Sequence, residues 1–253
     1  MGRIDGKVAI VTGGSQGLGK ADCEALAREG ARGVVITDIK VADGRALAGQ
    51  LNKARPGSAL FIEQDVRDEQ RWQEVIGRTV MEFGRLDVLV NNAGIVIPAT
   101  PEATTLEQFR LHNAVMSEGM FLGCKHAIPA MRKSGGGSII NMASVATHLG
   151  YPAFFAYSAA KGAIRGMTKS IAVWCQMQKY NIRCNSLHPG ATDTPMITET
   201  NRLLGIPEDY FTNSGPGLGR PQDVASIVVF LASDESRLIN GAELVADNAL
   251  TIQ

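Results

Sequence analysis

Residues 7–19 read KVAIVTGGSQGLG, an apolar segment that runs directly into a glycine-rich turn. The first six of these residues are mostly apolar and rich in valine and isoleucine, which is typical of a strand buried on both faces. After the glycines, residues 16–29 carry apolar side chains at helical spacing, and Gly30 ends this pattern. A buried strand, a glycine turn and a helix in this order predict the first unit of an α/β fold.

The same alternation continues to the end of the chain. Further strands are predicted over residues 34–37, 60–62, 88–90, 138–142, 182–187 and 244–245. Helices are predicted over residues 41–53, 68–83, a long region ending near 131, 157–180 and 221–232, with Asp68 as an N-cap. Because each crossover returns the chain to the same edge of the sheet, the strands should pair in parallel. We therefore expect a doubly wound, parallel, seven-stranded sheet with helices on both faces, the Rossmann fold, whose ligands bind beyond the carboxyl ends of the strands.

The length of 253 residues and the absence of a low-complexity segment predict one domain over residues 1–253. Residues 190–220 form the one long connection in this scheme. Loops of that length are usually functional, so this segment is predicted to be a lid over the substrate.

Composition excludes several classes of function. Lys and Arg together number 25, as do Asp and Glu, so no basic excess is available to bind nucleic acid. The sequence contains no run of about 18 apolar residues, so no membrane span is predicted. The N-terminus lacks the apolar core of a signal peptide. The four cysteines are scattered, which favours a reduced, cytoplasmic protein without a zinc site. His148 and His188 lack metal-binding spacing and are expected to be structural.

The glycine-rich turn predicts a dinucleotide site. Gly13, Gly17 and Gly19 permit a tight turn and the close approach of a ligand, and the following helix presents free N–H groups to a pyrophosphate. An ordinary turn is the alternative, but the position between a strand and a helix is the context that the motif requires.

Asp38 ends the next predicted strand, about twenty residues after the turn. Its carboxylate can accept hydrogen bonds from the adenosine ribose and would repel a 2′-phosphate, which favours NAD over NADP. Lys40 can weaken this preference if it is more than a solvated surface charge. Asp65, Val66 and the segment 91–94 follow the next two strands and suit the adenine and ribose. Taken singly, each could equally be a turn, because Asn, Asp and Gly are the commonest turn formers.

Tyr157 and Lys161 lie one helical turn apart on one face of a predicted helix. Oxidation of a secondary alcohol needs a base for the hydroxyl proton, and a free tyrosine with a pKa of about 10 ionises too weakly at neutral pH. A neighbouring ammonium group is expected to lower that pKa. Ser144, just beyond the strand 138–142, can hold the substrate oxygen beside the phenol, or it can be a turn or capping residue.

These motifs together resemble the short-chain dehydrogenase/reductase family over essentially the whole chain. The matching residues are Thr12-Gly13-x3-Gly17-x-Gly19, Asn91-Asn92-Ala93-Gly94, Ser144, Tyr157-x3-Lys161 and Pro189-Gly190. The resemblance implies that Tyr157 is the general acid/base, that Lys161 binds the nicotinamide ribose and lowers the pKa of Tyr157, and that Ser144 positions the carbonyl. It further implies that Asn113 holds a water in a proton relay, and that the protein is a homotetramer packed through its two long helices and last strand.

The resemblance also implies a set of dinucleotide contacts. They are Gly13, Ser15, Gln16, Gly17, Leu18, Gly19, Asp38, Ile39, Asp65, Val66, Asn92, Ala93, Gly94, Tyr157, Lys161, Pro189, Gly190, Thr192 and Thr194.

Within the family, the chain is similar to bacterial NAD-dependent 3β/17β-hydroxysteroid and alicyclic alcohol dehydrogenases. One departure from the family pattern is Asp247-Asn248-Ala249, where Asp-Gly-Gly is usual. The substrate pocket is expected to be apolar, because aromatic and aliphatic residues fill 148–155 and the lid: His148, Leu149, Tyr151, Phe154, Phe155, Met196, Ile197, Leu203, Leu204, Ile206, Tyr210 and Phe211.

The expected activity is the interconversion of a hydrophobic, cyclic or steroid-like secondary alcohol and its ketone with NAD(H). Many of the apolar residues could instead fill the core or a subunit interface. Two other functions stay open: a 3-oxoacyl carrier-protein reductase, which Asp38 opposes because that group commonly prefers NADP, and a non-catalytic dinucleotide sensor.

Overall fold

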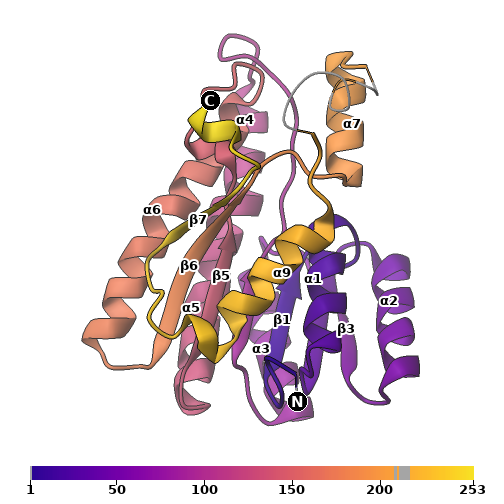
Figure 1. Ribbon diagram of the computed structural model, residues 1–253, viewed down its shortest axis with the longest axis vertical. Helices are drawn as coiled ribbons and strands as arrows, with labels where there is room; N and C mark the ends of the chain where they lie inside the picture. The colour runs from indigo at the N-terminus through magenta and orange to yellow at the C-terminus, as the bar shows by residue number, and fades with distance from the viewer. Residues whose placement is uncertain (1, 208–209, 211–216) are drawn as a thin grey trace.

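The computed structural model describes residues 2–207, 210 and 217–253 (Figure 1). Its centre is a seven-stranded sheet in the order β3-β2-β1-β4-β5-β6-β7, with every neighbouring pair parallel. The strands are β1 (Val8–Thr12), β2 (Gly33–Asp38), β3 (Ala59–Glu63), β4 (Val88–Asn91), β5 (Gly137–Met142), β6 (Ile182–Pro189) and β7 (Glu243–Ala246). The order reverses at β1, which has β2 on one side and β4 on the other. The predicted doubly wound sheet is confirmed.

Helices cover both faces of the sheet (Figure 1). One core joins it to α1 (Gly17–Arg28), α2 (Val41–Ala54) and α9 (Pro221–Ala232). The other core joins it to α3 (Glu69–Phe83), α5 (Gly119–Lys133) and α6 (Phe155–Met177). The remaining described elements are α4 (Leu106–His112), η1 (Asn113–Glu118), η2 (Val145–Thr147), α7 (Pro195–Leu204), η3 (Asp234–Ser236) and η4 (Leu250–Ile252). None of the described helices combines the length and apolarity needed to cross a membrane.

The sequence signals act locally as expected. Every residue of β1 and β2 is buried, as a strand covered on both faces requires. Asp68 caps α3 by accepting a hydrogen bond from the Arg71 N–H at 3.1 Å. All four cysteines (Cys23, Cys124, Cys175 and Cys184) are free and buried.

Three local features differ from the sequence prediction. The helix predicted over 157–180 spans Phe155–Met177, and its chain then reverses through Lys179 and Asn181, both at positive φ. The long helical region contains a π-helical stretch at Asn113–Glu118. At the C-terminal turn, Asn248 and Ala249 have φ of 50° and 67°, the left-handed region that glycine adopts at lowest cost.

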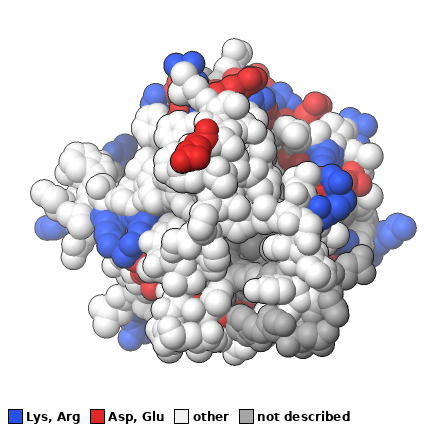
Figure 2. All heavy atoms as spheres, turned by 90° about the horizontal axis from the view of Figure 1, so that it is seen from above, with Lys and Arg blue, Asp and Glu red and all other residues white. Residues whose placement is uncertain are grey.

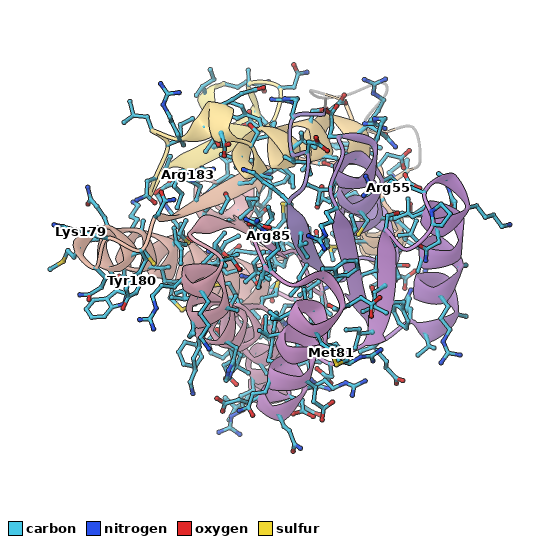
Figure 3. All side chains as sticks on the ribbon, turned by 90° about the horizontal axis from the view of Figure 1, so that it is seen from below. Arg55, Met81, Arg85, Lys179, Tyr180 and Arg183 are labelled. Carbon is cyan, nitrogen blue, oxygen red and sulfur yellow. The ribbon has the colours of Figure 1, made fainter. Side chains whose placement is uncertain are left out.

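The two edges of the sheet present different surfaces. Seen from above, over the carboxyl ends of the strands, the face is mostly uncharged and hollowed near its middle, with charge mainly toward the rim (Figure 2). The opposite edge carries the turns at the amino ends of the strands, and Lys179 and Tyr180 project there beyond α6 (Figure 3). A hydrophobic ligand therefore has its natural place at the carboxyl edge.

Asp22 of α1 is a buried acid whose carboxylate oxygens meet no hydrogen-bond partner among the described residues. Burial raises the pKa of Asp22 well above its usual value. The pKa of Asp22 in the unfolded chain is about 3.9. At pH values between this pKa and the raised pKa of the native state, the native protein keeps a proton on Asp22 that the unfolded chain has released. The contribution of Asp22 to stability therefore falls as the pH rises through this window.

Replacing Asp22 with leucine, a side chain of similar shape, is expected to raise the free energy of unfolding. The gain over the wild-type protein should grow from pH 5 to pH 8 by up to about 1.4 kcal/mol for each pH unit. Urea unfolding at several pH values measures it. The control is Asp43→Leu at an exposed position of α2, and a gain for Asp22→Leu that is no more pH-dependent than the control would contradict the prediction.

Candidate active site

The glycine-rich turn between β1 and α1 is built for the close approach of a ligand. Gly13 and Gly17 have φ of 60° and 54°, which glycine adopts without strain. A Cβ on Gly19 would lie 2.3 Å from the Gly13 oxygen, so the helix packs directly on the turn. The nearest described atoms to a Cβ on Gly17 would be those of the Thr194 and Pro195 side chains, at 3.5 Å or more. The glycine turn and the start of α7 therefore face each other.

The N-terminus of α1 fits a pyrophosphate. Its N-cap residue, Gln16, has an extended backbone and makes no side-chain capping hydrogen bond. The N–H groups of the first turn consequently have no capping side chain, and a helix N-terminus in that state favours an anion.

Asp38 lies beside the same turn. Its Oδ2 accepts hydrogen bonds from the Ser15 hydroxyl at 2.6 Å and the Ser15 N–H at 3.1 Å, and its Oδ1 accepts one from the Lys40 N–H at 2.9 Å. The Lys40 ammonium donates to Gln16 Oε1 at 2.8 Å, so this lysine reaches over the turn. Ile39 is 67% exposed next to the carboxylate. This arrangement offers a fixed carboxylate and an apolar surface to a ribose and its base.

The residues after β3 divide into two roles. Asp65 is held by Arg67, whose Nε lies 2.9 Å from both carboxylate oxygens, and these bonds lower the pKa of Asp65. Val66 is buried, and its carbonyl accepts a hydrogen bond from Trp72 Nε1 at 2.9 Å. The sequence analysis did not predict the ion pair of Arg67 with Asp65, although a cation two residues after the carboxylate could have suggested it.

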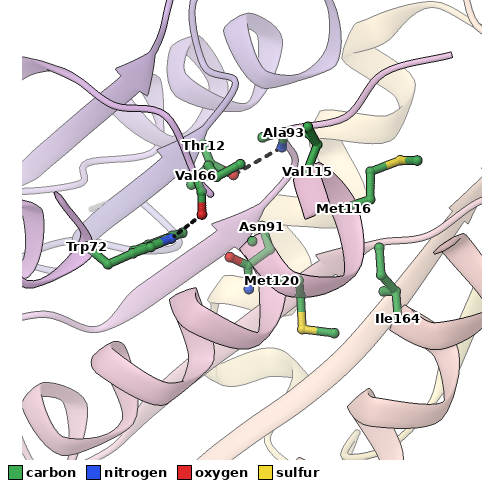
Figure 4. Close-up of a pocket in the computed structure, with 10 residues that line it drawn as sticks. Thr12, Val66, Trp72, Asn91, Ala93, Val115, Met116, Met120 and Ile164 are labelled. Atoms are coloured by element: carbon green, nitrogen blue, oxygen red, sulfur yellow. Dashed lines mark hydrogen bonds between the residues drawn. The ribbon is translucent and has the colours of Figure 1, made fainter. Parts of the chain in front are cut away.

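Asn92 and Thr12 tie the loop after β4 to the glycine turn. The Asn92 amide donates to the Thr12 oxygen at 2.9 Å and the Gly13 oxygen at 3.1 Å, and Thr12 Oγ1 accepts the Asn92 and Ala93 N–H groups, each at 3.0 Å. Figure 4 shows Thr12 directed at Ala93 on the wall of an inner, mainly apolar cavity. The side-chain nitrogen and the backbone N–H of Asn92 are thus used within the protein, to hold the loop after β4 against the glycine turn.

Ser144 and Tyr157 come together at the carboxyl end of β5. Ser144 is 9% exposed, and its Oγ accepts the Ala146 N–H at 3.2 Å. Burial raises the pKa of Tyr157, and a side-chain hydrogen bond with Ser144 works against that rise. The pKa of Tyr157 is therefore shifted upward in this structure, opposite to the expected direction.

The reason lies in the position of Lys161. Its Nζ donates to the Met142 carbonyl at 2.5 Å and lies 5.7 Å from the centroid of the Tyr157 ring. Lys161 is 4% exposed, and burial lowers its pKa to about 7. The Lys161 ammonium is held by a backbone carbonyl, and with a pKa of about 7 it is only partly charged at neutral pH. It therefore adds little positive charge at the phenol, and desolvation decides the pKa of Tyr157.

A buried chain of amides holds α6 against the sheet. The Asn91 amide donates to Asn141 Oδ1 at 2.8 Å, and the Asn141 amide donates to the Thr168 hydroxyl at 2.9 Å. Thr168 lies two helical turns after Lys161 on the same helix. The register of α6 is thereby fixed from β4 and β5, which sets where Tyr157 and Lys161 emerge.

Asn113 stands at the start of the π-helical stretch, and its side chain is used within the helix. Its amide donates to the Phe109 oxygen at 2.9 Å, and its Oδ1 lies 3.1 Å from the Ser117 hydroxyl. That hydroxyl also lies 3.3 Å from the carbonyl oxygen of Ala160, which directly precedes Lys161. The structure thus connects Asn113 with α6 through Ser117, a residue that sequence reasoning did not single out.

The segment after β6 continues the same edge. The Gly190 N–H donates to the Ala246 oxygen at 3.0 Å, and a Cβ on Gly190 would lie 3.0 Å from the Asp247 Cα. Thr192 is buried and donates to the Gly190 oxygen at 3.1 Å. Thr194 caps α7 by accepting the Ile197 N–H at 3.4 Å, and an open groove begins beside it.

Aromatic rings line the approach to Tyr157. The rings of Tyr151 and Phe154 are tilted at 52° to each other with centroids 5.6 Å apart, and Phe154 meets Tyr157 edge-on at 6.3 Å. Of the segment predicted to be a lid, α7 is described, and Met196 and Leu203 are 40% and 50% exposed on it. Phe211 lies outside the described residues.

Two histidines that the sequence analysis treated separately lie in contact. His148 Nε2 is 3.2 Å from His188 Nδ1 and 3.7 Å from a carboxylate oxygen of Glu243. In the described part of the chain, the potential ligand atoms of these three side chains lie within 4.8 Å of one another, close enough to share a metal ion. Arg165 at 2.7 Å and Lys169 at 2.6 Å already neutralise Glu243, however, and these cations oppose the entry of a metal ion.

Comparison with known proteins agrees with this geometry. The family model described as short chain dehydrogenase matches residues 7–204. The chain is 40% identical to the 3-beta-hydroxysteroid dehydrogenase of Comamonas testosteroni, covering 98% of this chain and 97% of the relative. It is 38% identical to the cyclopentanol dehydrogenase of Comamonas sp. and 39% identical to the NADP-dependent (R)-specific alcohol dehydrogenase of Lentilactobacillus kefiri, each over 99% of both chains.

The contact between α1 and the glycine turn makes Gly19→Ala a direct test of the site geometry. The added methyl group would meet the Gly13 oxygen and the Asn92 amide, and we expect a loss of about 1–3 kcal/mol in the free energy of unfolding. Gly77→Ala, at an open position within α3, is the control and should gain about 0.5–1 kcal/mol. Urea unfolding compares them, and equal stability of the two variants would contradict the geometry.

Proposed function

The chain belongs to the short-chain dehydrogenase family, and from this premise we propose that it interconverts a hydrophobic, cyclic or steroid-like secondary alcohol and its ketone with NAD(H). The observation that carries the proposal is the convergence of Ser144, Tyr157 and Lys161 at the carboxyl end of β5. A Tyr-based alcohol dehydrogenase and ketoreductase is the activity that these groups support best.

In the proposed reaction the protein handles the proton. A nicotinamide dinucleotide held by the glycine turn and Asp38 would supply the hydride chemistry at the carbinol carbon. The Ser144 hydroxyl holds the substrate oxygen beside the Tyr157 phenol. Because burial raises its pKa, Tyr157 keeps its proton at neutral pH, which is the form that protonates a ketone oxygen. In oxidation the phenolate takes the hydroxyl proton.

Lys161 and Asn113 complete the proposed proton path. With its pKa lowered to about 7, Lys161 can both hold and release a proton near neutral pH. We assign it to the nicotinamide ribose and to the approach of protons to Tyr157. Asn113, linked to α6 through Ser117, is assigned to the outer end of this path.

The proposed cofactor is NAD(H). We assign the Asp38 carboxylate to the adenosine ribose of the dinucleotide, and its fixed position beside the glycine turn, held by Ser15 and the Lys40 N–H, supports this assignment. The Lys40 ammonium is held by Gln16. A 2′-phosphate would meet the Asp38 charge at close range, even though one relative is named as NADP-dependent.

The proposed substrate is uncharged and hydrophobic. The rings of Tyr151, Phe154 and Tyr157 form an apolar wall, and the face over the carboxyl ends of the strands is mostly uncharged (Figure 2). The names of the relatives include a hydroxysteroid and a cyclopentanol dehydrogenase, which agrees with a ring-shaped alcohol. The orientation of such a substrate would rest on its one oxygen.

We further propose a cytoplasmic homotetramer. Exposed apolar side chains on the long helices and the last strand support packing between copies: Phe121, Val173, Trp174, Met177 and Val245. Four buried, free cysteines agree with a reducing compartment.

Tyr157→Phe tests the proposed acid/base group. Removing the phenolic oxygen should lower kcat for cyclopentanol or a 3-hydroxysteroid by about 100-fold to 10,000-fold, while NADH still binds. NADH absorbance measures turnover, and NADH fluorescence measures binding. Tyr180→Phe, at the opposite edge of the sheet (Figure 3), is the control and should be unaffected. Substantial turnover by Tyr157→Phe would remove this residue from the mechanism.

Asp38→Asn tests the cofactor assignment. Loss of the negative charge should raise the ratio of kcat/KM with NADP to kcat/KM with NAD by about tenfold or more. Asp43→Asn removes the same charge at an exposed position in the first turn of α2 and should leave the ratio unchanged. A wild-type protein that strongly prefers NADPH would contradict the assignment.

A further inference from the structure

His188 is a fully buried side chain next to the candidate active site. It is the next-to-last residue of β6, which ends at Pro189. Its Nδ1 lies 3.2 Å from the Ser144 carbonyl oxygen and 2.9 Å from the Thr147 hydroxyl, and its Nε2 lies 2.8 Å from the Ser186 hydroxyl. Both ring nitrogens are therefore engaged, one of them at the backbone of Ser144.

The position of this contact in the sheet is informative. Strands β5 and β6 pair as far as Met142 and Leu187, and the Ala143 N–H still donates to the Leu187 oxygen at 2.8 Å. Backbone pairing ends there, and Ser144 and His188 are the next residues on each strand. The imidazole thus extends the cross-link between the two strands by one more step, using a side chain in place of the backbone.

The hydrogen-bonding groups around the ring favour one tautomer. Burial lowers the pKa of His188 to about 4, so the ring is neutral at physiological pH and carries one N–H. The Ser144 carbonyl can only accept a hydrogen bond, and the Thr147 hydroxyl beside Nδ1 donates its own proton to that carbonyl at 2.9 Å, so both accept from Nδ1. The Ser186 hydroxyl lies 2.8 Å from Nε2 and 3.4 Å from the Ala242 oxygen, so its shorter bond is a donation to Nε2. With the proton on Nδ1, the ring donates to Ser144 and accepts from Ser186. The opposite tautomer would leave a nitrogen lone pair facing the Ser144 oxygen.

On its outer side the His188 ring contacts His148, which lies next to a cluster of charged side chains. His148 Nε2 lies 3.2 Å from His188 Nδ1, and Glu243 of β7 lies 3.7 Å from His148. Arg165 and Lys169, both from α6, hold the Glu243 carboxylate. These contacts join η2, α6 and β7 around His188, so the imidazole has little freedom to turn.

We propose that His188 is a positioning residue for the reaction: in its Nδ1–H form it holds the backbone of Ser144 at a fixed place relative to Pro189 and Gly190. This role rests on the proposed function. Ser144 has an extended backbone and lies at the beginning of η2, where pairing with β6 has already ended. Its hydroxyl can be aimed at the substrate oxygen only if this backbone stays in place, because small displacements of a reacting group cost large factors in rate.

Two substitutions separate the functions of the two ring nitrogens. Asparagine carries its amide nitrogen as many bonds from Cβ as Nδ1, and glutamine carries its own as many as Nε2. His188→Asn should therefore keep the bond to Ser144 and retain kcat within about threefold, whereas His188→Gln should lose about tenfold or more in kcat. NADH binding by fluorescence should change less than twofold in both variants, since neither removes a dinucleotide contact. Equal kcat for the two variants would overturn the proposal.

A double-mutant cycle tests whether His188 acts through Ser144. In the Ser144→Ala background, His188→Gln should cost little further turnover, because the hydroxyl that it misplaces is already absent. The same loss as in the wild-type background would overturn the proposal, since purely structural damage adds to the effect of Ser144→Ala. His126→Gln, on α5 beside Glu69, is the control substitution and should leave kcat unchanged.

The tautomer gives a readout that needs no turnover. Long-range ¹⁵N–¹H correlation spectra of histidine-labelled protein should show a neutral Nδ1–H ring whose signals disappear in His188→Gln. An Nε2–H ring at His188 would overturn the proposal whatever the activity. A wild-type protein that turns over no alcohol or ketone would instead overturn the proposed function, so the two failures are distinguishable.

Discussion

The fixed position of α6 against β5 is the constraint on which the candidate active site depends. Two hydrogen bonds set it: Lys161 Nζ to the Met142 oxygen at 2.5 Å, and the Asn141 amide to the Thr168 hydroxyl at 2.9 Å. Both lie in the buried layer between helix and sheet, where an unpaired polar group is costly. A slip of α6 by one residue would break both bonds, so the helix has one favourable register.

This constraint also determines the electrostatics of the site. The same burial that fixes Lys161 lowers its pKa to about 7, and it raises the pKa of Tyr157. Desolvation moves both groups toward their neutral forms, so the pKa of Lys161 falls well below that of Tyr157. The site is thus prepared by the packing of the helix before any ligand contributes.

The sequence predicted those parts of the molecule that local chemistry decides. Asp68 caps its helix as expected, and Asp38 lies at the edge of the glycine turn, because strand ends and helix starts are set by neighbouring residues. Contacts between distant segments escaped prediction. His188 and Ser144 are far apart in the chain, and only the pairing of β5 with β6 reveals their contact. The predicted lowering of the pKa of Tyr157 was also wrong: burial raises it, and burial depends on the complete fold.

The burial of all four cysteines has a practical consequence. Burial raises the pKa of each thiol, and the nucleophilic thiolate is therefore scarce in the native protein. Alkylating reagents would react only when a segment opens. Because Cys23 lies in one core and Cys124, Cys175 and Cys184 lie in the other, mass spectrometry of the labelled positions would time the opening of each helical layer separately. The chain therefore carries its own reporters of partial unfolding, and no engineered probe is needed.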